Sequence, residues 1–265
     1  MAIFEELGIS ATILIDGKPA KEYDNHKEDP KYREGNADAA FQSKYIEVVD
    51  AAAFKLCFTM RRSKKKFPWL WKDGKHCVTF VAAVDGQITQ EETLVSGEQG
   101  RKLVWRGYTA GLKDHPEGEG IVVLKDFKFQ AVTLVEDTDR ERVAKDKVRS
   151  ETMGVINVSV FRSVRTGEEG LRESTSRVTE PNFSVAEKAL NGRAISHATG
   201  FGDSHVLPTD DSRTAILEYP DHLPFAVFIF RFRSRKALMQ ECIIPRDPEP
   251  TYINGIEFID LTQED

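Results

Sequence analysis

Residues 54–61 read Phe-Lys-Leu-Cys-Phe-Thr-Met-Arg. Apolar side chains stand at every second position, and mostly polar side chains stand between them. Because successive side chains of a β-strand point to opposite faces, this pattern predicts a strand with one face in a core and the other largely polar. Strand pairing is therefore the expected basis of the fold.

A second stretch, residues 225–233, carries three alternate phenylalanines, Phe228, Phe230 and Phe232. A slip of one residue would expose all three, so their register is strongly specified. We expect this to be an end strand, where exposed cations discourage edge-to-edge pairing. Those cations are Arg231, Arg233, Arg235 and Lys236.

Short β-branched or alternating runs, separated by Gly, Asp and Pro, predict further strands. They span residues 9–16, 78–84, 103–108, 121–134, 155–162 and 214–219. Asp16-Gly17 and Asp85-Gly86 are turn dipeptides that end two of them. The spacing predicts an all-β (mainly β) fold, a β-sandwich or jelly-roll-like core.

Two or three short helices are expected. Capping-box spacings occur at residues 138–141 and 184–187, and the second opens a helical run over 185–191 that stops at a glycine. A third helical turn is predicted after Ser234. The polar stretch 165–182 is predicted to be a long surface loop or a linker.

Composition places the chain among globular proteins, with 40% hydrophobic and 30% charged residues in 265. We expect a single β-sandwich-type domain over residues 1–250 and an interaction tail over 251–265. The net charge of −6 argues against a general polyanion binder, so nucleic acid is an unlikely partner. Neither a signal peptide nor a membrane span is visible, so we expect an intracellular protein, in the nucleus or cytoplasm.

Catalytic and metal-binding patterns are weak. The three cysteines, Cys57, Cys77 and Cys242, are far apart and fit free thiols in a reducing compartment. His197 and His205 flank Gly200-Phe201-Gly202, which we interpret as a surface hairpin with incidental histidines rather than a zinc site. We expect no metal, no cofactor and no catalytic residues.

Several segments in order resemble an uncharacterised fungal β-rich family known only as a domain of unknown function. They are residues 15–19 with 22–23, 154–162, 187–194, 224–235 and 243–250. Roughly residues 5 to 250 are covered, and the charged stretch 25–37 departs from the pattern. The resemblance implies a compact β-rich domain and supplies no activity, ligand or site residue.

A basic run follows the alternating strand: Arg61, Arg62, Lys64, Lys65 and Lys66. Five cations in six residues are typical of a nuclear-import signal. A solvated loop, and a loop that contacts phosphates beside Trp69 and Trp71, are the other interpretations.

The C-terminal tail supports the most specific hypothesis. After the proline-rich stop at residues 246–250, the order apolar-apolar-Asp-Leu-Thr-x-acid-acid resembles a SUMO-interacting motif, which binds by adding a strand to a sheet edge. Its members are Phe258, Ile259, Asp260, Leu261, Thr262, Glu264 and Asp265. Alternatively, residues 252–261 form the last strand of the domain.

Taken together, the sequence predicts a non-enzymatic protein-interaction module whose partner is a SUMO-like modifier. A self-assembling or structural β protein, forming a homo-oligomer through its edge strands, is the second interpretation. An enzyme without a recognisable motif ranks third.

Overall fold

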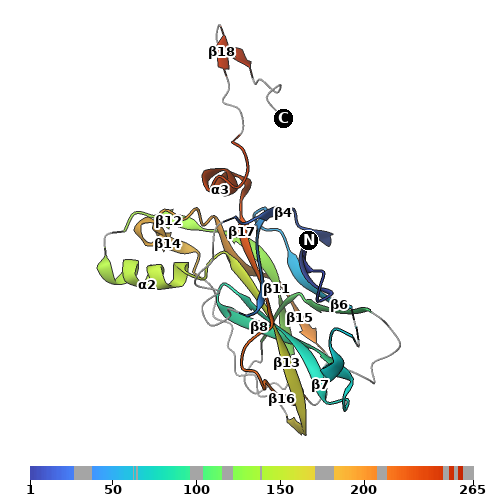
Figure 1. Cartoon of the computed structure of the whole chain (residues 1–265). Coiled ribbons are helices and arrows are strands. Elements are labelled where there is room, and N and C mark those ends of the chain that lie inside the picture. Colours follow the sequence, from blue (N-terminus) through green and yellow to red (C-terminus); the bar gives the residue numbers. More distant parts are fainter. Residues whose placement is uncertain are drawn as a thin grey trace.

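The structure is a computed structural model that describes residues 1–26, 38–61, 63, 65–95, 104–114, 122–137, 139–170, 182–207, 214–246, 251–253 and 256–258. The chain is mainly β, as predicted, with two α-helices and two 3₁₀ helices in these ranges (Figure 1). Two large sheets enclose one main core, a third sheet closes its end, and a small helical unit stands beside them.

The larger sheet has seven strands in the order β4-β5-β17-β13-β7-β8, with β16 paired to β13. Their bounds are β4 Glu22–Asp24, β5 Ala40–Glu47, β7 His76–Val84, β8 Gln87–Val95, β13 Val155–Gly170, β16 Thr214–Glu218 and β17 Ala226–Arg233. β17 lies between β5, which runs parallel to it, and β13, which runs antiparallel. The prediction of an end strand is therefore wrong. Val227 and Ile229 are buried on the second face, so this strand is apolar on both sides and suits an interior position.

The smaller sheet has the order β1-β2-β6-β9, with β3 paired to β2. The bounds are β1 Ala2–Phe4, β2 Ile9–Ile15, β3 Lys18–Pro19, β6 Phe54–Arg61 and β9 Val104–Thr109. The alternation in β6 is confirmed: Phe54, Leu56, Phe58 and Met60 are buried, and the residues between them are at least partly exposed. Both Asp-Gly dipeptides form tight turns, in which Asp16 and Asp85 adopt positive φ like the glycines after them.

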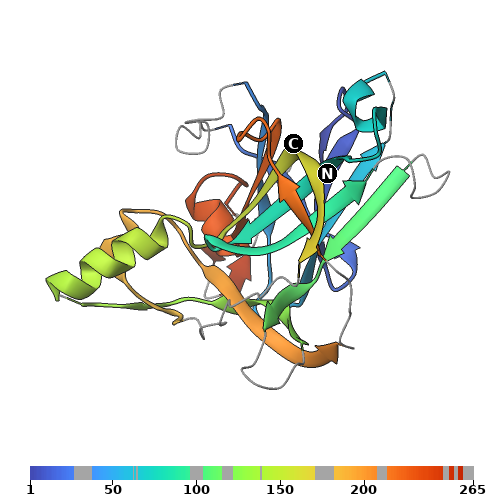
Figure 2. The same cartoon turned by 90° about the horizontal axis from the view of Figure 1, so that it is seen from below.

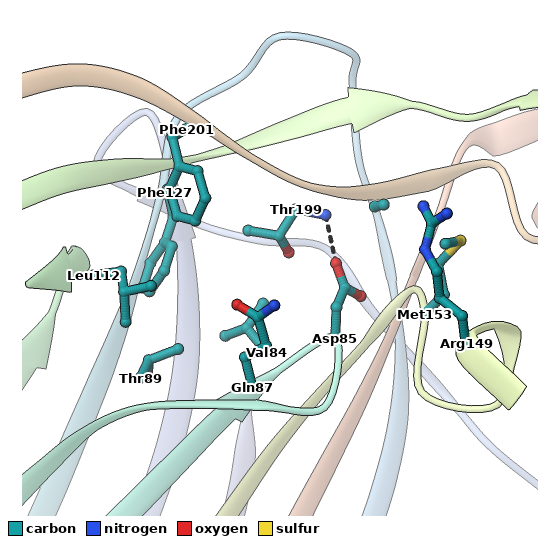
Figure 3. A pocket seen from close by; sticks show the side chains of 11 residues that line it. Val84, Asp85, Gln87, Thr89, Leu112, Phe127, Arg149, Met153, Thr199 and Phe201 are labelled. Carbon is teal, nitrogen blue, oxygen red and sulfur yellow. Dashed lines mark hydrogen bonds between the residues drawn. The ribbon is translucent and has the colours of Figure 1, made fainter. Parts of the chain in front are cut away.

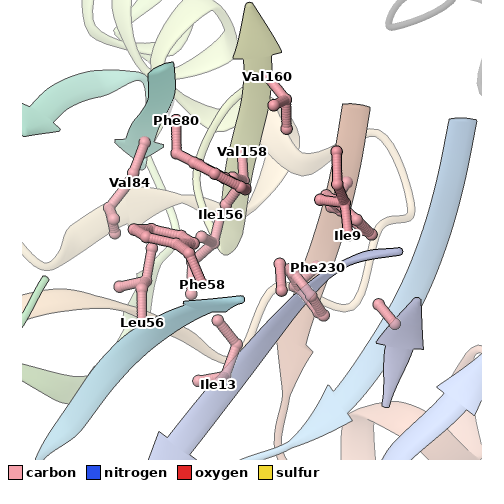
Figure 4. Packing of buried hydrophobic residues seen from close by; sticks show 14 of the residues in the cluster. Ile9, Ile13, Leu56, Phe58, Phe80, Val84, Ile156, Val158, Val160 and Phe230 are labelled. Atoms are coloured by element: carbon pink, nitrogen blue, oxygen red, sulfur yellow. The ribbon is translucent and has the colours of Figure 1, made fainter. Parts of the chain in front are cut away.

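The main core lies where the two sheets face each other (Figure 4). Phe58 from β6 stacks on Phe80 from β7, with ring centroids 5.3 Å apart. Phe230 and the other alternate phenylalanines of β17 also point into this core. Such offset aromatic pairs add to the free energy gained from burial, so they fix the two sheets against each other.

A third sheet closes one end of the core. It consists of β10 (Gly111–Asp114), β11 (Val122–Ala131) and β15 (His197–Leu207). Phe129 of β11 stacks on Phe54 with ring centroids 4.2 Å apart. The run predicted over 121–134 is divided, because β12 (Thr133–Val135) leaves this sheet and pairs with β14 (Ser184–Ala186).

The small helical unit lies beside the sandwich in both views (Figures 1 and 2). It contains α2 (Arg140–Ser150), the β12–β14 pair and the 3₁₀ helix η2 (Glu187–Leu190). Asp139, one residue after the predicted cap, caps α2 by accepting a hydrogen bond from the Glu141 amide. Thr138 lies outside the described residues.

The second predicted capping box, at residues 184–187, is wrong. Ser184 pairs with Thr133 in the β12–β14 ladder, so η2 begins only after Ala186. The stop at Asn191-Gly192 is confirmed, since both residues adopt positive φ.

Of the two predictions for residues 165–182 and for the segment after Ser234, the first is wrong in part and the second is confirmed. The predicted loop 165–182 is wrong at its start, because residues up to Gly170 continue β13 and pair with β16. Residues 171–181 lie outside the described part. The helical turn after Ser234 is confirmed as α3 (Arg235–Gln240), whose cap is the Ser234 side chain.

The alternation in β6 makes a testable contrast between two residues of one strand. Phe58→Ala should lower the free energy of unfolding by about 3–5 kcal/mol, because it removes a fully buried ring from the inter-sheet stack. Lys55→Ala, at an exposed position, should change it by less than about 0.5 kcal/mol. Denaturant unfolding followed by tryptophan fluorescence measures both, and equal losses would contradict the described register.

Candidate functional site

The described residues of the C-terminal tail pair with each other. β18 (Thr251–Ile253) and β19 (Ile256–Phe258) form an antiparallel two-stranded sheet. Within the described part of the chain, neither strand joins a sheet of the domain, and the hairpin lies beyond α3 (Figure 1). Of the predicted motif, only the backbone of Phe258 is described, and residues 259–265 lie outside the described part.

A buried ion pair fixes the end of the domain just before this tail. The Arg233 side chain is 4% exposed, and its Nε donates to Glu241 Oε1 at 3.1 Å. Tyr45 donates its hydroxyl to Glu241 Oε2 at 2.7 Å. The expectation that Arg233 is exposed is thus wrong. Its charge is tolerated inside because Glu241 neutralises it and the backbone carbonyls of Gly154 and Phe232 accept hydrogen bonds from its Nη1.

Both partners of Glu241 have shifted pKa values. Burial lowers the pKa of the Arg233 guanidinium, and Glu241 counteracts this effect. Burial, together with the hydrogen bond to Glu241, raises the pKa of Tyr45 to about 12. Leu238 and Ile244 pack with Tyr45 in a small cluster, so β5, β17 and α3 are fastened together.

This raised pKa predicts a dependence of stability on pH. Ionisation of Tyr45 is opposed in the folded protein, so its contribution is complete below pH ~10 and is lost as the pH rises towards about 12. Tyr45→Phe should lower the free energy of unfolding by about 1–3 kcal/mol at pH 8, because Glu241 loses a donor. The difference from the unsubstituted protein should shrink between pH 10 and 11.5.

The control is Tyr108→Phe, at a residue that is 50% exposed on β9. It should leave the free energy of unfolding nearly unchanged at both ends of this pH range. A constant difference between the Tyr45→Phe variant and the unsubstituted protein across the range would refute the assignment.

The basic run lies on the surface where it is described. Arg61, Lys65 and Lys66 are exposed, and Lys66 Nζ donates to the Glu5 carbonyl at 2.9 Å. Arg62 and Lys64 lie outside the described residues. The chain then returns to the core at Phe67 and Leu70, which are buried. The exposed cations are therefore accessible to another protein, and the buried side chains after them hold this segment against the domain.

The two histidines of the predicted hairpin lie on one continuous strand, so the hairpin prediction is wrong. β15 pairs with β11 on both sides of Gly200 and Gly202. A Cβ at Gly200 would lie 3.2 Å from the ring of Phe183, so close packing explains this glycine better than a turn does. His197 is buried, with a lowered pKa caused by that burial, whereas His205 pairs with Asp126 on the surface. The described residues contain no group of three or more potential metal ligands.

Asp85, which the sequence indicated only as part of a turn, is the centre of a polar cluster. Its carboxylate accepts hydrogen bonds from the Gly154 amide at 2.6 Å and from the Thr199 amide at 2.5 Å. Burial raises the pKa of this carboxyl group, and the two amides offset part of that rise. The carboxylate therefore joins the β7–β8 turn to the start of β13 and to β15.

A cavity of about 200 Å³ lies beside this carboxylate (Figure 3). Leu112, Phe127 and Phe201 form its apolar end, whereas Asp85 and Arg149 lie at the other end. The side chains come from β10, β11, β15, the β7–β8 turn and α2. This site was missed from the sequence because its members are dispersed over more than a hundred residues. The only local signal was an acidic residue in a turn that follows a mostly apolar strand.

These observations define the chain as an all-β domain of two facing sheets with a third sheet at one end. The model of a family described as a domain of unknown function, DUF7918, matches residues 8–247, and the chain belongs to this family. No curated protein and no solved structure matches the chain. In the described ranges, none of the helices has the length and apolar character needed to cross a membrane.

Proposed function

We propose that the protein is a non-enzymatic interaction module whose C-terminal tail binds a SUMO-like modifier by strand addition. The observation that carries this proposal is the position of β18 and β19, which, as far as the chain is described, pair with each other and not with the sheets of the domain. The backbone N–H and C=O groups of such a hairpin can form hydrogen bonds with another protein at little cost to the stability of the domain. The tail also follows a firmly fixed end, because Glu241 is held by Arg233 and Tyr45.

The residues after β19 have the chemistry that strand addition requires. In an extended segment, alternate side chains enter pockets on one face, and the backbone supplies the hydrogen bonds. Ile259 and Leu261 are the alternate apolar groups for the pockets, and the neighbouring Phe258 adds an apolar side chain at the start of the motif. Asp260, Glu264 and Asp265 supply negative charge that steers the tail to a basic partner and makes binding sensitive to salt.

The expected affinity is modest. Burial of each apolar side chain contributes on the order of 1.5–3 kcal/mol. Ordering the backbone costs roughly 1–2 kcal/mol per residue, which the new main-chain hydrogen bonds only partly offset. The tightest binding that we expect from a tail of this length therefore has a dissociation constant in the micromolar range, on the order of 10 μM.

Replacement of two apolar residues of the tail by alanine tests whether the tail binds the modifier. Ile259→Ala with Leu261→Ala should abolish amide shifts in a labelled SUMO-like modifier titrated with the full chain. The melting temperature of the domain should stay within about 1 °C, because these residues lie beyond its fixed end. Ile253→Ala, an equal apolar truncation in the same tail, is the matched control and should bind normally.

Two results would contradict the proposal. One is the absence of shifts at several hundred micromolar (about 500 μM) of the unsubstituted protein, well above the expected constant. The other is a large fall in melting temperature in the double variant, which would place these residues in the core of the domain.

The exposed basic run supports a second role, nuclear import of the module. Arg61, Lys65 and Lys66 are all exposed, which an import receptor requires. Replacement of Lys64, Lys65 and Lys66 by Ala should move a fluorescently tagged chain to the cytoplasm without a change in melting temperature. Replacement of the exposed residues Lys145, Lys147 and Lys188 by Ala removes the same charge and should leave the distribution unchanged. Nuclear accumulation of both variants would reject the import role.

A further inference from the structure

The cavity beside Asp85 has two chemically different ends (Figure 3). At one end, Leu112, Phe127 and Phe201 present apolar side chains from three strands of the closing sheet. At the other end, the Asp85 carboxylate and the Arg149 side chain face the same space. An acceptor and a cationic donor at one end of an apolar pocket are the arrangement that orients an amphipathic small molecule.

Thr199 lies between the two ends, and among the described residues its hydroxyl has no hydrogen bond of ordinary geometry. The residue is 8% exposed, and its amide is already bonded to Asp85. Its Oγ1 is buried and, within the described part of the chain, forms no hydrogen bond of ordinary geometry, although it is close enough to favour the ionised form of Asp85. A buried hydroxyl without a partner is unfavourable, so a ligand that supplies one is bound more tightly.

The Asp85 carboxylate also has acceptor capacity left. Two backbone amides donate with good geometry, one to each oxygen, while the Val155 amide and the Thr199 hydroxyl lie close enough to favour the ionised form without forming hydrogen bonds of ordinary geometry. An ionised carboxylate accepts about four hydrogen bonds in all, so a ligand donor of better geometry can take one of these positions. Arg149 is about one-third exposed, and its contact with Asp146 is long, at 3.9 Å, so its guanidinium has donors available. A head group that donates to Asp85 and accepts from Arg149 satisfies both. An anionic head group would be repelled by the negative charge of the Asp85 carboxylate.

The volume limits the size of the ligand. An apolar cavity of roughly 150 Å³ in another protein holds one benzene molecule. A cavity of about 200 Å³ therefore accommodates a ring of that size and a short polar group. Drug-sized ligands, which need pockets of roughly 300 Å³ or more, are too large.

We propose that this cavity binds a small neutral amphipathic molecule, with an apolar body of about benzene's size and a head group that both donates and accepts hydrogen bonds, such as a primary amide. The apolar body packs against Phe127, Phe201 and Leu112. The head group donates to Asp85 and accepts from Arg149 or Thr199. This site is separate from the tail and from the basic run, so it does not depend on the function proposed for either.

Three probes of equal size test the proposal: benzamide, acetophenone and benzoate. Benzamide carries the donor and the acceptor, acetophenone replaces the donor by a methyl group, and benzoate replaces it by a negatively charged oxygen. Titration of the full chain, followed by amide shifts, should move the signals of Gly154 and Thr199 with benzamide. With about nine non-hydrogen atoms, its dissociation constant should be on the order of 1 mM.

The differences between the probes decide the chemistry. Acetophenone should bind about tenfold more weakly, because it leaves the Asp85 acceptor without a donor. Benzoate should give no shift up to about 20 mM, because its charge repels the carboxylate. Equal affinities for all three probes, shifts confined to other residues, or no shift with benzamide at about 20 mM would each overturn the proposal.

A pair of threonine variants supplies the matched control. Thr199→Val removes the hydroxyl in the cavity and should weaken benzamide at least about threefold, with acetophenone little changed. Thr109→Val removes another buried hydroxyl without a hydrogen-bond partner in the described residues, on β9 and away from the cavity lining. It should leave both affinities unchanged. If the two variants behave alike, Thr199 has no part in binding and the proposed contact is wrong.

Discussion

Gly154 connects the partly buried Asp85 carboxylate with the buried Arg233 side chain, and much of the structure depends on this junction. Its amide donates to Asp85 at 2.6 Å, and its carbonyl accepts from Arg233 Nη1 at 2.9 Å. Asp85 continues the chain of hydrogen bonds to Thr199 on β15, and Arg233 continues it through Glu241 to Tyr45. Removing a charged group from water is costly unless a counter-ion or hydrogen-bond donors and acceptors compensate it, so the segments that supply these partners are held in place together.

This chain of contacts connects the two parts of the molecule to which we assign functions. One end lies at the cavity, where Asp85 and Thr199 face the apolar side chains of the closing sheet. The other end lies at α3, just before the prolines that precede the tail. The hydrophobic core between the sheets stabilises the body, whereas the polar chain determines how the turn, the third sheet and the C-terminal helix are placed on it.

The sequence predicted the mainly β fold because the signal is local. In β6, alternate apolar residues report burial directly, and the two Asp-Gly turns and the Ser234 cap depend only on their own side chains and neighbours. The predictions failed where contacts between residues far apart in the sequence determine the local structure. Arg231 and Arg233 indicated an edge strand, but Glu241 allows Arg233 to be buried in the middle of a sheet. Gly200 and Gly202 indicated a turn, but close packing against Phe183 explains Gly200 within a continuous strand whose register with β11 shifts after Phe201.

The cavity could not be predicted for the same reason. Asp85, Arg149 and Thr199 carry no shared motif, and they meet only because the end of α2 and strand β15 converge on the β7–β8 turn. The basic run and the tail are different, because each is a continuous segment whose chemical character is evident from the sequence alone. Their functional interpretation therefore rests mainly on sequence, and that of the cavity rests on structure.

Comparison of two glycine variants tests the role of the Gly154 junction most directly. Gly154 and Gly74 both adopt a φ of 71°, so an alanine at either position has the same backbone strain. A Cβ at Gly154 would lie 2.5 Å from the enclosed Arg233 guanidinium, whereas a Cβ at Gly74 would meet nothing within 4 Å. Gly154→Ala should therefore reduce the free energy of unfolding by at least about 2 kcal/mol more than Gly74→Ala, because it displaces a buried ion pair. Equal losses in the two variants would show that the junction is not a central constraint on the fold.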